Sequence, residues 1–419
     1  MKAKNMLNGL STALFIVIML GFVTPSFAQT NTFDGSAGNN WNTAASWSLN
    51  LVPTAAHNVV IPNGYNVTVN TAAVCASLSI GSGGTATSVT ISGTNSLAVS
   101  GAVTINAGTG SGDNKYIAVG TGTLSCASVS MVDPGKDNRD CYITISTGTV
   151  NITGNIVMSG SAARNQVTFT NAGTLNIGGT MSGGGFTPNA STVNYNASGA
   201  QTIGSYTYNN LILSGSGTKT LQTGTTAING DLTVSGTASA TTVANLAISG
   251  NLEVGTGAAF TTGANFTLGV SGTTSVTGTL TLANTGTKTF TGDVTINSGG
   301  IWNETGIAAI NFAGNLQNDG TYSATSNTGT HSFTGADKTI SGANTIAIQT
   351  GAINGTYTNE GTLTLNTALS GTGGLTQGVN SILNIGGTSG ITNLDATNSG
   401  NTVNYTGAAQ TIHLNDYNN

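Results

Sequence analysis

Charge is the scarcest property of this 419-residue chain. Charged residues make up 5% of it, with 9 Lys and Arg against 14 Asp and Glu, whereas an average soluble protein has roughly 25%. The formal net charge is −5. A chain with so few basic residues has no patch that could neutralise a phosphate backbone, so we expect no nucleic-acid partner.

Long hydrophobic runs are absent beyond the N-terminus. There, Lys2 and Lys4 precede an apolar run over residues 10–23, and Pro-Ser-Phe-Ala follows, with small residues at the cleavage-determining positions. These features predict a signal peptide over residues 1–28 and an extracellular or outer-cell-surface location reached by Sec export. The alternative is a membrane anchor, but the run is shorter than the about 20 residues that a spanning helix needs. We therefore expect no transmembrane segment.

Cysteine is also scarce, and the three that occur, Cys75, Cys126 and Cys141, are an odd number. At least one must lack a partner within the chain. Cys75 and Cys126 stand in matching phrases, C-A-S-L-S-I and C-A-S-V-S-M, which indicates equivalent core positions in different coils. Cys126 and Cys141 bracket a charged segment, and a disulfide between them would close that loop in an oxidising compartment. Both interpretations stay open.

What the chain does contain is a recurring five-residue phrase, Gly-x-apolar-x-apolar. Nine copies begin at Gly101, Gly122, Gly154, Gly173, Gly230, Gly250, Gly278, Gly292 and Gly361. The alternation predicts strands with one buried face, and a recurring spacing of about 20 residues predicts stacked coils. The fold class that follows is all-β: a right-handed parallel β-helix (β-solenoid) with an N-terminal cap.

Residues 29–75 differ from the coils expected over 76–419, because they hold two of the three tryptophans, Trp41 and Trp47. The first coil of a solenoid has an open edge that invites aggregation, so an atypical first segment is typical of a cap. The alternative is that Trp41 and Trp47 stack on sugar rings.

A longer repeat lies over the short one. Leu-Asn-Ile-Gly-Gly occurs at 175–179 and again at 383–387, and each copy is followed by Thr-Val-Asn-Tyr, Ala-Gln-Thr-Ile and Tyr-Asn-Asn. The two copies, 175–210 and 383–419, define an internal superrepeat of roughly 209 residues. The second copy stops where the first enters its next strand, so we expect this sequence to be the front of a longer protein.

Several of these motifs together resemble a known group. They are the W…W…P…I-P opening, the T-V-N-Y…A-Q-T-I…Y-N-N-L unit, and the G-T-K-T-L/F turns at 217–221 and 286–290. The chain is similar to the large β-strand-repeat (parallel β-helix, pectin-lyase-like) surface and adhesin-like proteins of Gram-negative bacteria. The resemblance implies export, in many members through the type IX system, and a style of fold more than an activity. His57 and Asn58 stand where that group often has an acidic residue, which weakens any implied calcium site there.

One charged loop is the candidate for a metal site. Its hard oxygen ligands, the kind that calcium prefers, are Asp133, Asp137, Asn138 and Asp140. Their spacing matches neither the EF-hand loop nor the glycine-aspartate nonapeptide, and Lys136 and Arg139 compete for the carboxylates. We expect a solvated turn with local ion pairs and no metal, with calcium as the alternative.

Catalytic arrangements are not recognisable. Polysaccharide cleavage needs a base and acidic groups that converge on one groove. Lys219, Lys288 and Lys338 instead occupy the turn phrases T-K-T and D-K-T, and the three histidines, His57, His331 and His413, stand apart in the sequence. We expect no catalytic residues, no cofactor and no enzymatic activity.

The function predicted is an exported surface stalk of the structural or adhesin-like type. It would mediate cell-surface or extracellular-matrix interactions, with carbohydrate or other cell-surface components as partners and self-association through an open C-terminal coil. The alternative is a carbohydrate-binding or polysaccharide-degrading β-helix whose active module lies outside this sequence.

Overall fold

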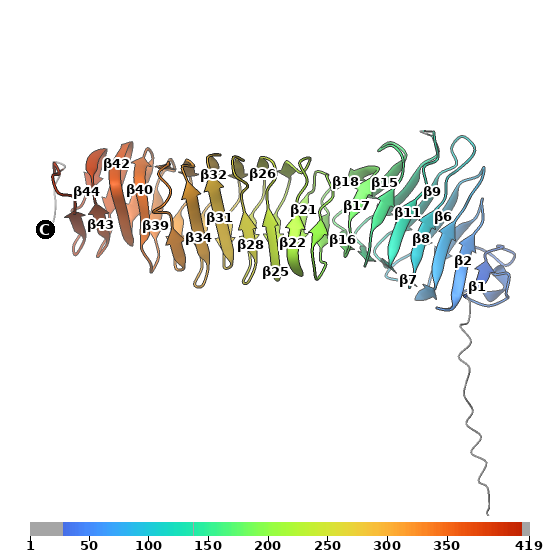
Figure 1. The fold of residues 1–419 in the computed structure, drawn as a ribbon. Coiled ribbons are helices and arrows are strands. Elements are labelled where there is room, and N and C mark those ends of the chain that lie inside the picture. The colour runs from blue at the N-terminus through green and yellow to red at the C-terminus, as the bar shows by residue number, and fades with distance from the viewer. Residues whose placement is uncertain (1–27, 137, 413–419) are drawn as a thin grey trace, which may run out of the picture.

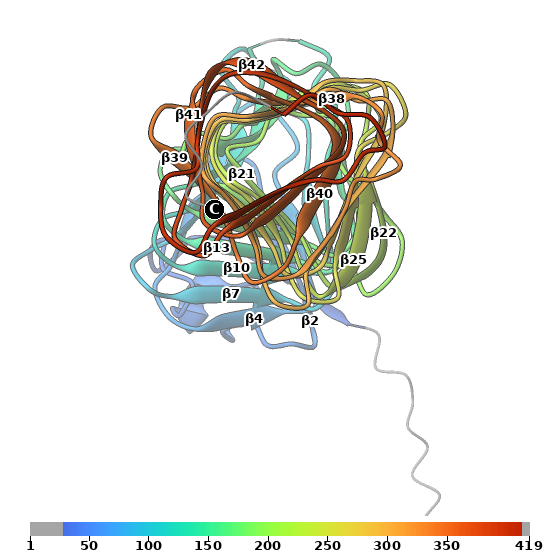
Figure 2. The ribbon, with the colours of Figure 1, turned by 90° about the vertical axis from the view of Figure 1, so that its left-hand side faces the viewer.

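Parallel strands wind into a rod in the computed structural model, which describes residues 28–136 and 138–412 (Figure 1). The described ranges make about 17 coils, so the rod is about 80 Å long at about 4.8 Å per coil. Seen from its C-terminal end, the chain advances toward the viewer in the right-handed sense (Figure 2). The only helix of the described residues is one short 3₁₀ turn, Ala44–Ser46. The predicted β-solenoid is therefore confirmed.

One sheet, here called the continuous sheet, runs along the whole rod. It contributes one strand to each coil, and neighbouring strands pair in parallel. Its strands are β4 (Ala73–Cys75), β7 (Ser96–Val99), β10 (Thr123–Cys126), β13 (Thr149–Ile152), β16 (Thr174–Ile177), β19 (Thr192–Tyr195), β21 (Asn210–Leu213), β24 (Leu232–Val234), β27 (Leu252–Val254), β30 (Thr274–Val276), β33 (Val294–Ile296), β36 (Leu316–Asn318), β39 (Lys338–Ser341) and β41 (Thr356–Asn359).

Two further sheets, the N-terminal sheets, complete the coils of the first half. The first contains β1 (Gln29–Thr32), β2 (His57–Ile61), β5 (Ser77–Ile80), β8 (Ala102–Ile105), β11 (Ser128–Met131), β14 (Ile156–Met158) and β17 (Met181–Gly183). The second contains β3 (Asn66–Val69), β6 (Thr87–Ile91), β9 (Lys115–Val119), β12 (Cys141–Ile145), β15 (Asn165–Phe169) and β18 (Gly185–Thr187).

A different pair, the C-terminal sheets, completes the coils of the second half. One contains β20 (Gln201–Thr202), β22 (Ser216–Thr220), β25 (Thr237–Thr241), β28 (Ala259–Thr261), β31 (Thr279–Asn284), β34 (Ile301–Gly306) and β37 (Thr321–Ser323). The other contains β23 (Ala227–Ile228), β26 (Leu246–Ile248), β29 (Leu268–Val270), β32 (Lys288–Phe290), β35 (Ile310–Phe312) and β38 (Thr330–Phe333). The last coils are formed by longer strands, β40 (Ile346–Ile353), β42 (Thr362–Gln377), β43 (Ile382–Ile385), β44 (Thr388–Asp395) and β45 (Thr402–Tyr405).

The interior of the rod is filled by columns of apolar side chains. Both apolar positions of each of the nine phrases are buried, as the alternation predicts. Aromatic residues stack from coil to coil: the ring centroids of Phe290 and Phe312 are 5.8 Å apart, and those of Phe312 and Phe333 are 5.4 Å apart. In-register pairing keeps like positions above one another, so each coil buries its apolar face on its neighbours.

The glycine that opens the phrase is required by the close approach of neighbouring coils. A Cβ on Gly250 would lie 2.3 Å from Asp231 Oδ1 and 2.6 Å from the carbonyl carbon of Gly230. The next side chain supports the same turn, because Asp231 Oδ1 accepts the Asn251 N–H at 2.7 Å and Asn251 Oδ1 accepts the Thr273 N–H at 2.8 Å. The phrase therefore encodes both a strand and the turn that stacks it.

Residues 33–56 fold over the start of the rod. The backbone of Trp41 donates to Thr68 O, and Thr68 donates to Asn39 O, both at 2.8 Å, so this segment covers the outer edge of β3. Strands β2, β3 and β4 fall within the range 29–75 assigned to the cap, yet they already form a complete coil. The capping chain is thus the shorter segment before β2.

The two copies of the superrepeat share a local hydrogen-bond pattern. In the first, Gln201 Nε2 donates to the backbone oxygens of Ile177 and Gly179, each at 2.7 Å. In the second, Gln410 Nε2 donates to the two matching oxygens at the end of β43. The Ala-Gln-Thr-Ile motif therefore has a structural role, which is to fasten a turn to the coil before it. Residues 413–419 of the second copy lie outside the described ranges.

We expect Gly250→Ala to destabilise the rod by about 1–3 kcal/mol, because the added methyl group would overlap the preceding coil. Gly269→Ala is the matched control, since a Cβ there meets nothing within 4 Å and should change stability by less than about 0.5 kcal/mol. Chemical denaturation of both variants measures the difference. Equal effects would contradict the close-packing explanation of the phrase glycine.

Candidate functional site

The two candidate sugar-stacking residues are inside the cap. Trp41 and Trp47 are both 0% exposed. Their ring centroids are 5.0 Å apart in an edge-to-face arrangement, Phe33 contacts Trp47 at the same distance, and Trp47 Nε1 donates to Trp41 O at 2.9 Å. A ring with no exposed face cannot stack on a sugar in this conformation. These tryptophans form the core of the cap.

The three cysteines are buried free thiols. Cys126 lies on β10 in the continuous sheet, whereas Cys141 lies on β12 in an N-terminal sheet and contacts Asn106 O at 3.4 Å. The structure therefore does not join the two as a disulfide. Burial raises the pKa of each thiol to about 12, so they remain protonated and unreactive at neutral pH.

The charged loop holds an ion pair. Arg164 Nη1 lies 3.0 Å from Asp133 Oδ1, which also accepts the Gly135 N–H at 2.8 Å. These hydrogen bonds lower the pKa of Asp133. Asn138 donates to Ser111 Oγ at 2.8 Å, while Asp137 lies outside the described residues. Nowhere in 28–136 or 138–412 do three or more His, Cys, Asp or Glu residues gather in a way that could hold a metal ion.

Several lysines are inside the rod, which the sequence did not indicate. Among the described residues, Lys115, Lys219 and Lys288 are 0% exposed. Lys219 Nζ donates to Ala197 O at 2.8 Å and to Gln201 Oε1 at 3.0 Å. Burial lowers the pKa of all three ammonium groups. Each cation is bound by oxygens of turns, so the T-K-T phrase at 218–220 and 287–289 has a structural role.

The most concentrated polar chemistry of the described residues is a buried network around Glu304. Its carboxylate accepts from Trp302 Nε1 at 2.6 Å, Tyr322 OH at 2.9 Å and Asn327 Nδ2 at 2.8 Å. His331 Nε2 lies 2.7 Å from Glu304 Oε2, and both side chains are 0% exposed. His331 stands apart from Glu304 in the sequence, and the winding of the next coil brings it to this carboxylate across 27 residues.

The electrostatics of this network favour an ionised Glu304. Burial alone raises the pKa of its carboxyl group, but hydrogen bonds and charge from His331, together with hydrogen bonds from Asn327 and Trp302, outweigh burial and hold the pKa below 4.5, its usual value. Burial raises the pKa of Tyr322 well above its ordinary range, so that hydroxyl stays a donor. With four donors on one carboxylate and no exposed surface, the network stabilises the interior and offers no access to a substrate.

A surface hollow lies where the N-terminal sheets end. Strand β17 pairs only with β14, and β20 pairs only with β22. The hollow has a volume of about 520 Å³ and lies between these two strands, lined by residues 180–184 and 202–206 together with Gly160, Ala162 and Gln222. Ligand pockets in proteins span about 300–1,000 Å³. No signal in the sequence marked this site, except that the first superrepeat copy covers it.

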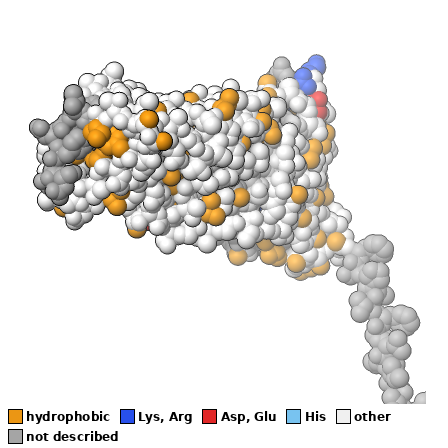
Figure 3. Space-filling model, turned by 60° about the vertical axis from the view of Figure 1, so that its left-hand side comes forward, with side chains coloured by type: hydrophobic (Ala, Val, Ile, Leu, Met, Phe, Trp, Pro, Cys, Tyr) orange, Lys and Arg blue, Asp and Glu red, His pale blue; other side chains and the backbone are white. Residues whose placement is uncertain are grey.

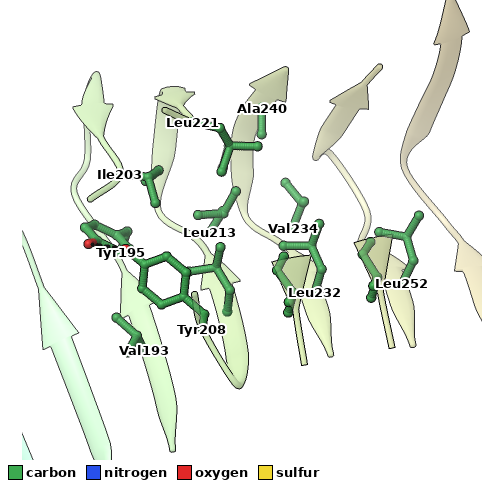
Figure 4. Packing of buried hydrophobic residues seen from close by; sticks show 14 of the residues in the cluster. Val193, Tyr195, Ile203, Tyr208, Leu213, Leu221, Leu232, Val234, Ala240 and Leu252 are labelled. Atoms are coloured by element: carbon green, nitrogen blue, oxygen red, sulfur yellow. Dashed lines mark hydrogen bonds between the residues drawn. The ribbon is translucent and has the colours of Figure 1, made fainter. Parts of the chain in front are cut away.

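The interior beneath this hollow is fully packed. Tyr195 and Tyr208 come from two sides of one coil and point into the rod beside Leu213, with Ile203 and Leu221 in the same cluster (Figure 4). The two tyrosine hydroxyls are 2.9 Å apart, and Tyr208 OH lies 2.7 Å from Gly204 O. The hollow therefore has a rigid floor and does not open into the core.

Part of the chain is similar to a known protein family. Residues 32–111, which hold the cap and the first coils, match a family described as a domain of unknown function (DUF8693). The match covers less than half of the chain, and its description names no activity. No curated protein and no solved structure matches the chain. Among the described residues, no helix has the length and apolar character needed to cross a membrane.

Stability should depend on pH through Glu304. Because the folded-state pKa is lowered, the stabilisation is fully present above pH 4.5, the usual pKa, and is lost as pH falls through the folded value. Glu304→Gln should cost about 3–5 kcal/mol at neutral pH and show a weaker loss of stability on acidification. Denaturation midpoints measured at several pH values test this. The control is Glu253→Gln, an exposed residue of β27; an identical acid response in both variants would contradict the prediction.

The charged loop should not depend on calcium, because Arg164 already neutralises Asp133. We expect EDTA and added calcium to leave the Tm unchanged. Thermal unfolding of the wild type and of Asp133→Ala measures this. A Tm that falls with EDTA in the wild type, but not in the variant, would show that the loop binds a metal.

Proposed function

We propose that this protein is an exported surface stalk of the adhesin type that mediates cell-surface or extracellular-matrix contacts. The observation that supports this most directly is the location of its titratable groups. Glu304, His331 and Lys219 are inside the rod and bound to structural partners. The outside presents mainly small uncharged residues, with scattered carboxylates such as Glu253 and Asp293, which suits a long spacer and a repeated contact surface better than a reaction centre.

The outer face of the continuous sheet illustrates this surface. Asn176 Nδ2 donates to Asn151 Oδ1 at 2.8 Å, and Asn194 Nδ2 donates to Asn176 Oδ1 at 3.2 Å, so one amide lies above another on successive coils. On the face drawn in Figure 3, charged side chains appear at only one place, toward the N-terminal coils. A repeated neutral face favours contacts that are weak per coil and strong in sum.

A polysaccharide-degrading role has less support. A lyase or hydrolase needs a base exposed on a lateral groove, but Lys115, Lys219 and Lys288 are buried. The proposal therefore includes no catalytic role for this chain. Export by the signal peptide expected at residues 1–28 and location on the outer cell surface are also part of the proposal. Residues 1–27 lie outside the described ranges.

Cells that display the full-length protein should adhere better to a glycan- or matrix-coated surface than cells from which it is deleted. The purified chain should release no reducing or unsaturated ends from pectin, alginate or glycosaminoglycans. Adhesion counts and end-group assays measure the two outcomes. Equal adhesion of both strains would overturn the stalk proposal, and new chain ends would support the enzymatic alternative.

A further inference from the structure

The hollow between β17 and β20 is a break in an otherwise regular ladder. Strands β17 and β18 are the last of the N-terminal sheets, and β20 is the first strand of a C-terminal sheet. In the part of the chain that is described, no strand pairs with the C-terminal side of β17 or with the N-terminal side of β20. Backbone polar groups on these two edges therefore have no ladder partner, in the middle of the rod and away from both ends.

Side-chain hydrogen bonds connect the two segments that border the hollow, around β17 and around β20. Gln201 Nε2 donates to Gly179 O at 2.7 Å on one side of the hollow, and Tyr206 OH donates to Gly183 O on the other. Burial raises the pKa of Tyr206 to about 12, so its hydroxyl remains a donor. The hollow keeps its shape without a strand to fill it, which is the preorganisation that a binding site needs.

The lining is polar and uncharged. Ser182, Thr202 and Ser205 are exposed, and their hydroxyls can donate and accept hydrogen bonds. Tyr206 adds an aromatic ring that is half-buried and lies 5.5 Å, centroid to centroid, from the ring of Phe186. None of the residues that line the hollow carries a charge. Hydroxyls around an aromatic ring match the chemistry of a neutral sugar, which has polar edges and apolar C–H faces.

An extended peptide fits the site less well. β-Strand addition relies on a row of main-chain hydrogen bonds along an exposed edge. Here the edges belong to strands of three and two residues, β17 and β20. Gly183 O, on one of those edges, already accepts from Tyr206. A peptide would gain few main-chain bonds, whereas a sugar could use the hydroxyl lining.

We infer that the hollow formed by residues 180–184 and 202–206 is a binding subsite for a neutral oligosaccharide, with Tyr206 as its aromatic platform. This inference rests on the proposed adhesin function and adds to it a defined site and a ligand class. It places specific recognition where the two coil shapes meet, while the regular coils on either side act as spacers.

The test uses the purified full chain and isothermal titration with cellohexaose, maltohexaose and xylohexaose as neutral probes. Hexagalacturonate and a Ser-Thr peptide serve as comparison ligands. At least one neutral probe should bind, and Tyr206→Ala should raise its Kd about tenfold or more. Ser182→Trp should abolish binding by filling the hollow. Failure of all three neutral probes to bind, or tighter binding of the acidic probe or the peptide, would overturn the inference.

One control variant separates binding from folding. Ser130→Trp places the same bulk in the same outward row, because Ser130 pairs with Val157 and Val157 with Ser182, but Ser130 does not line the hollow. Its Kd should equal that of the wild type. If Tyr206→Ala lowers the Tm, the Ser182→Trp and Ser130→Trp pair still decides the question, and equal Kd values for these two variants would refute the subsite.

Cell adhesion then separates the subsite from the proposed function. Cells that display full-length Tyr206→Ala or Ser182→Trp should adhere less than wild-type cells, and Ser130→Trp should not change adhesion. Unchanged adhesion in all three would overturn the subsite as the adhesive site and leave the stalk proposal standing. A wild type that does not adhere would instead remove the proposed function itself.

Discussion

The spacing between stacked coils is the constraint on which this structure depends. Parallel pairing fixes that spacing at about 4.8 Å, and it applies to turns as well as to strands. At Gly250 the preceding coil is so close that even a methyl group would overlap it. The same closeness lets Asp231 and Asn251 accept backbone N–H groups from the next coil. Glycine followed by Asp or Asn thus allows one turn to stack closely on the next. The pair recurs through the sequence because every coil has to stack at the same spacing.

The same spacing determines what polar groups inside the rod can do. A coil whose neighbours lie above and below it leaves little room for water, so a buried charge must find its partners in the adjacent turns. Lys219 binds oxygens of the coil before it, and Glu304 takes donors from its own coil and the next. These groups are of the same residue types as catalytic acids and bases, but no substrate can reach them because they are buried. Titratable side chains in this fold are therefore weak indicators of activity unless a hollow reaches them.

The sequence predicts what repeats and does not predict what occurs once. Alternation identified the buried face of every phrase strand, including Leu280 and Leu282 of β31. The contact between Glu304 and His331 could not be predicted from the sequence. Coil lengths vary, so the sequence does not show which residues lie one coil apart. One local signal was available. Trp302 and Glu304 are two residues apart on β34, so the alternation of the strand places both side chains on its buried face. The tryptophans of the cap were ambiguous because composition alone does not distinguish a packed ring from an exposed one.

The break in the ladder follows from the lengths of consecutive segments, which no local pattern encodes. Strands β17 and β18 are separated by a single residue, whereas β19 and β20 are joined by a five-residue turn. In the coil that follows β17, the chain therefore forms no strand that pairs with β17. In a solenoid with unbroken ladders every backbone group along a face has a partner, and the surface offers only side chains. An interrupted ladder adds a concave shape lined by side chains while the continuous sheet keeps the rod intact. A repeat protein can in this way acquire a single specific site without giving up the regularity that stabilises the rest of it.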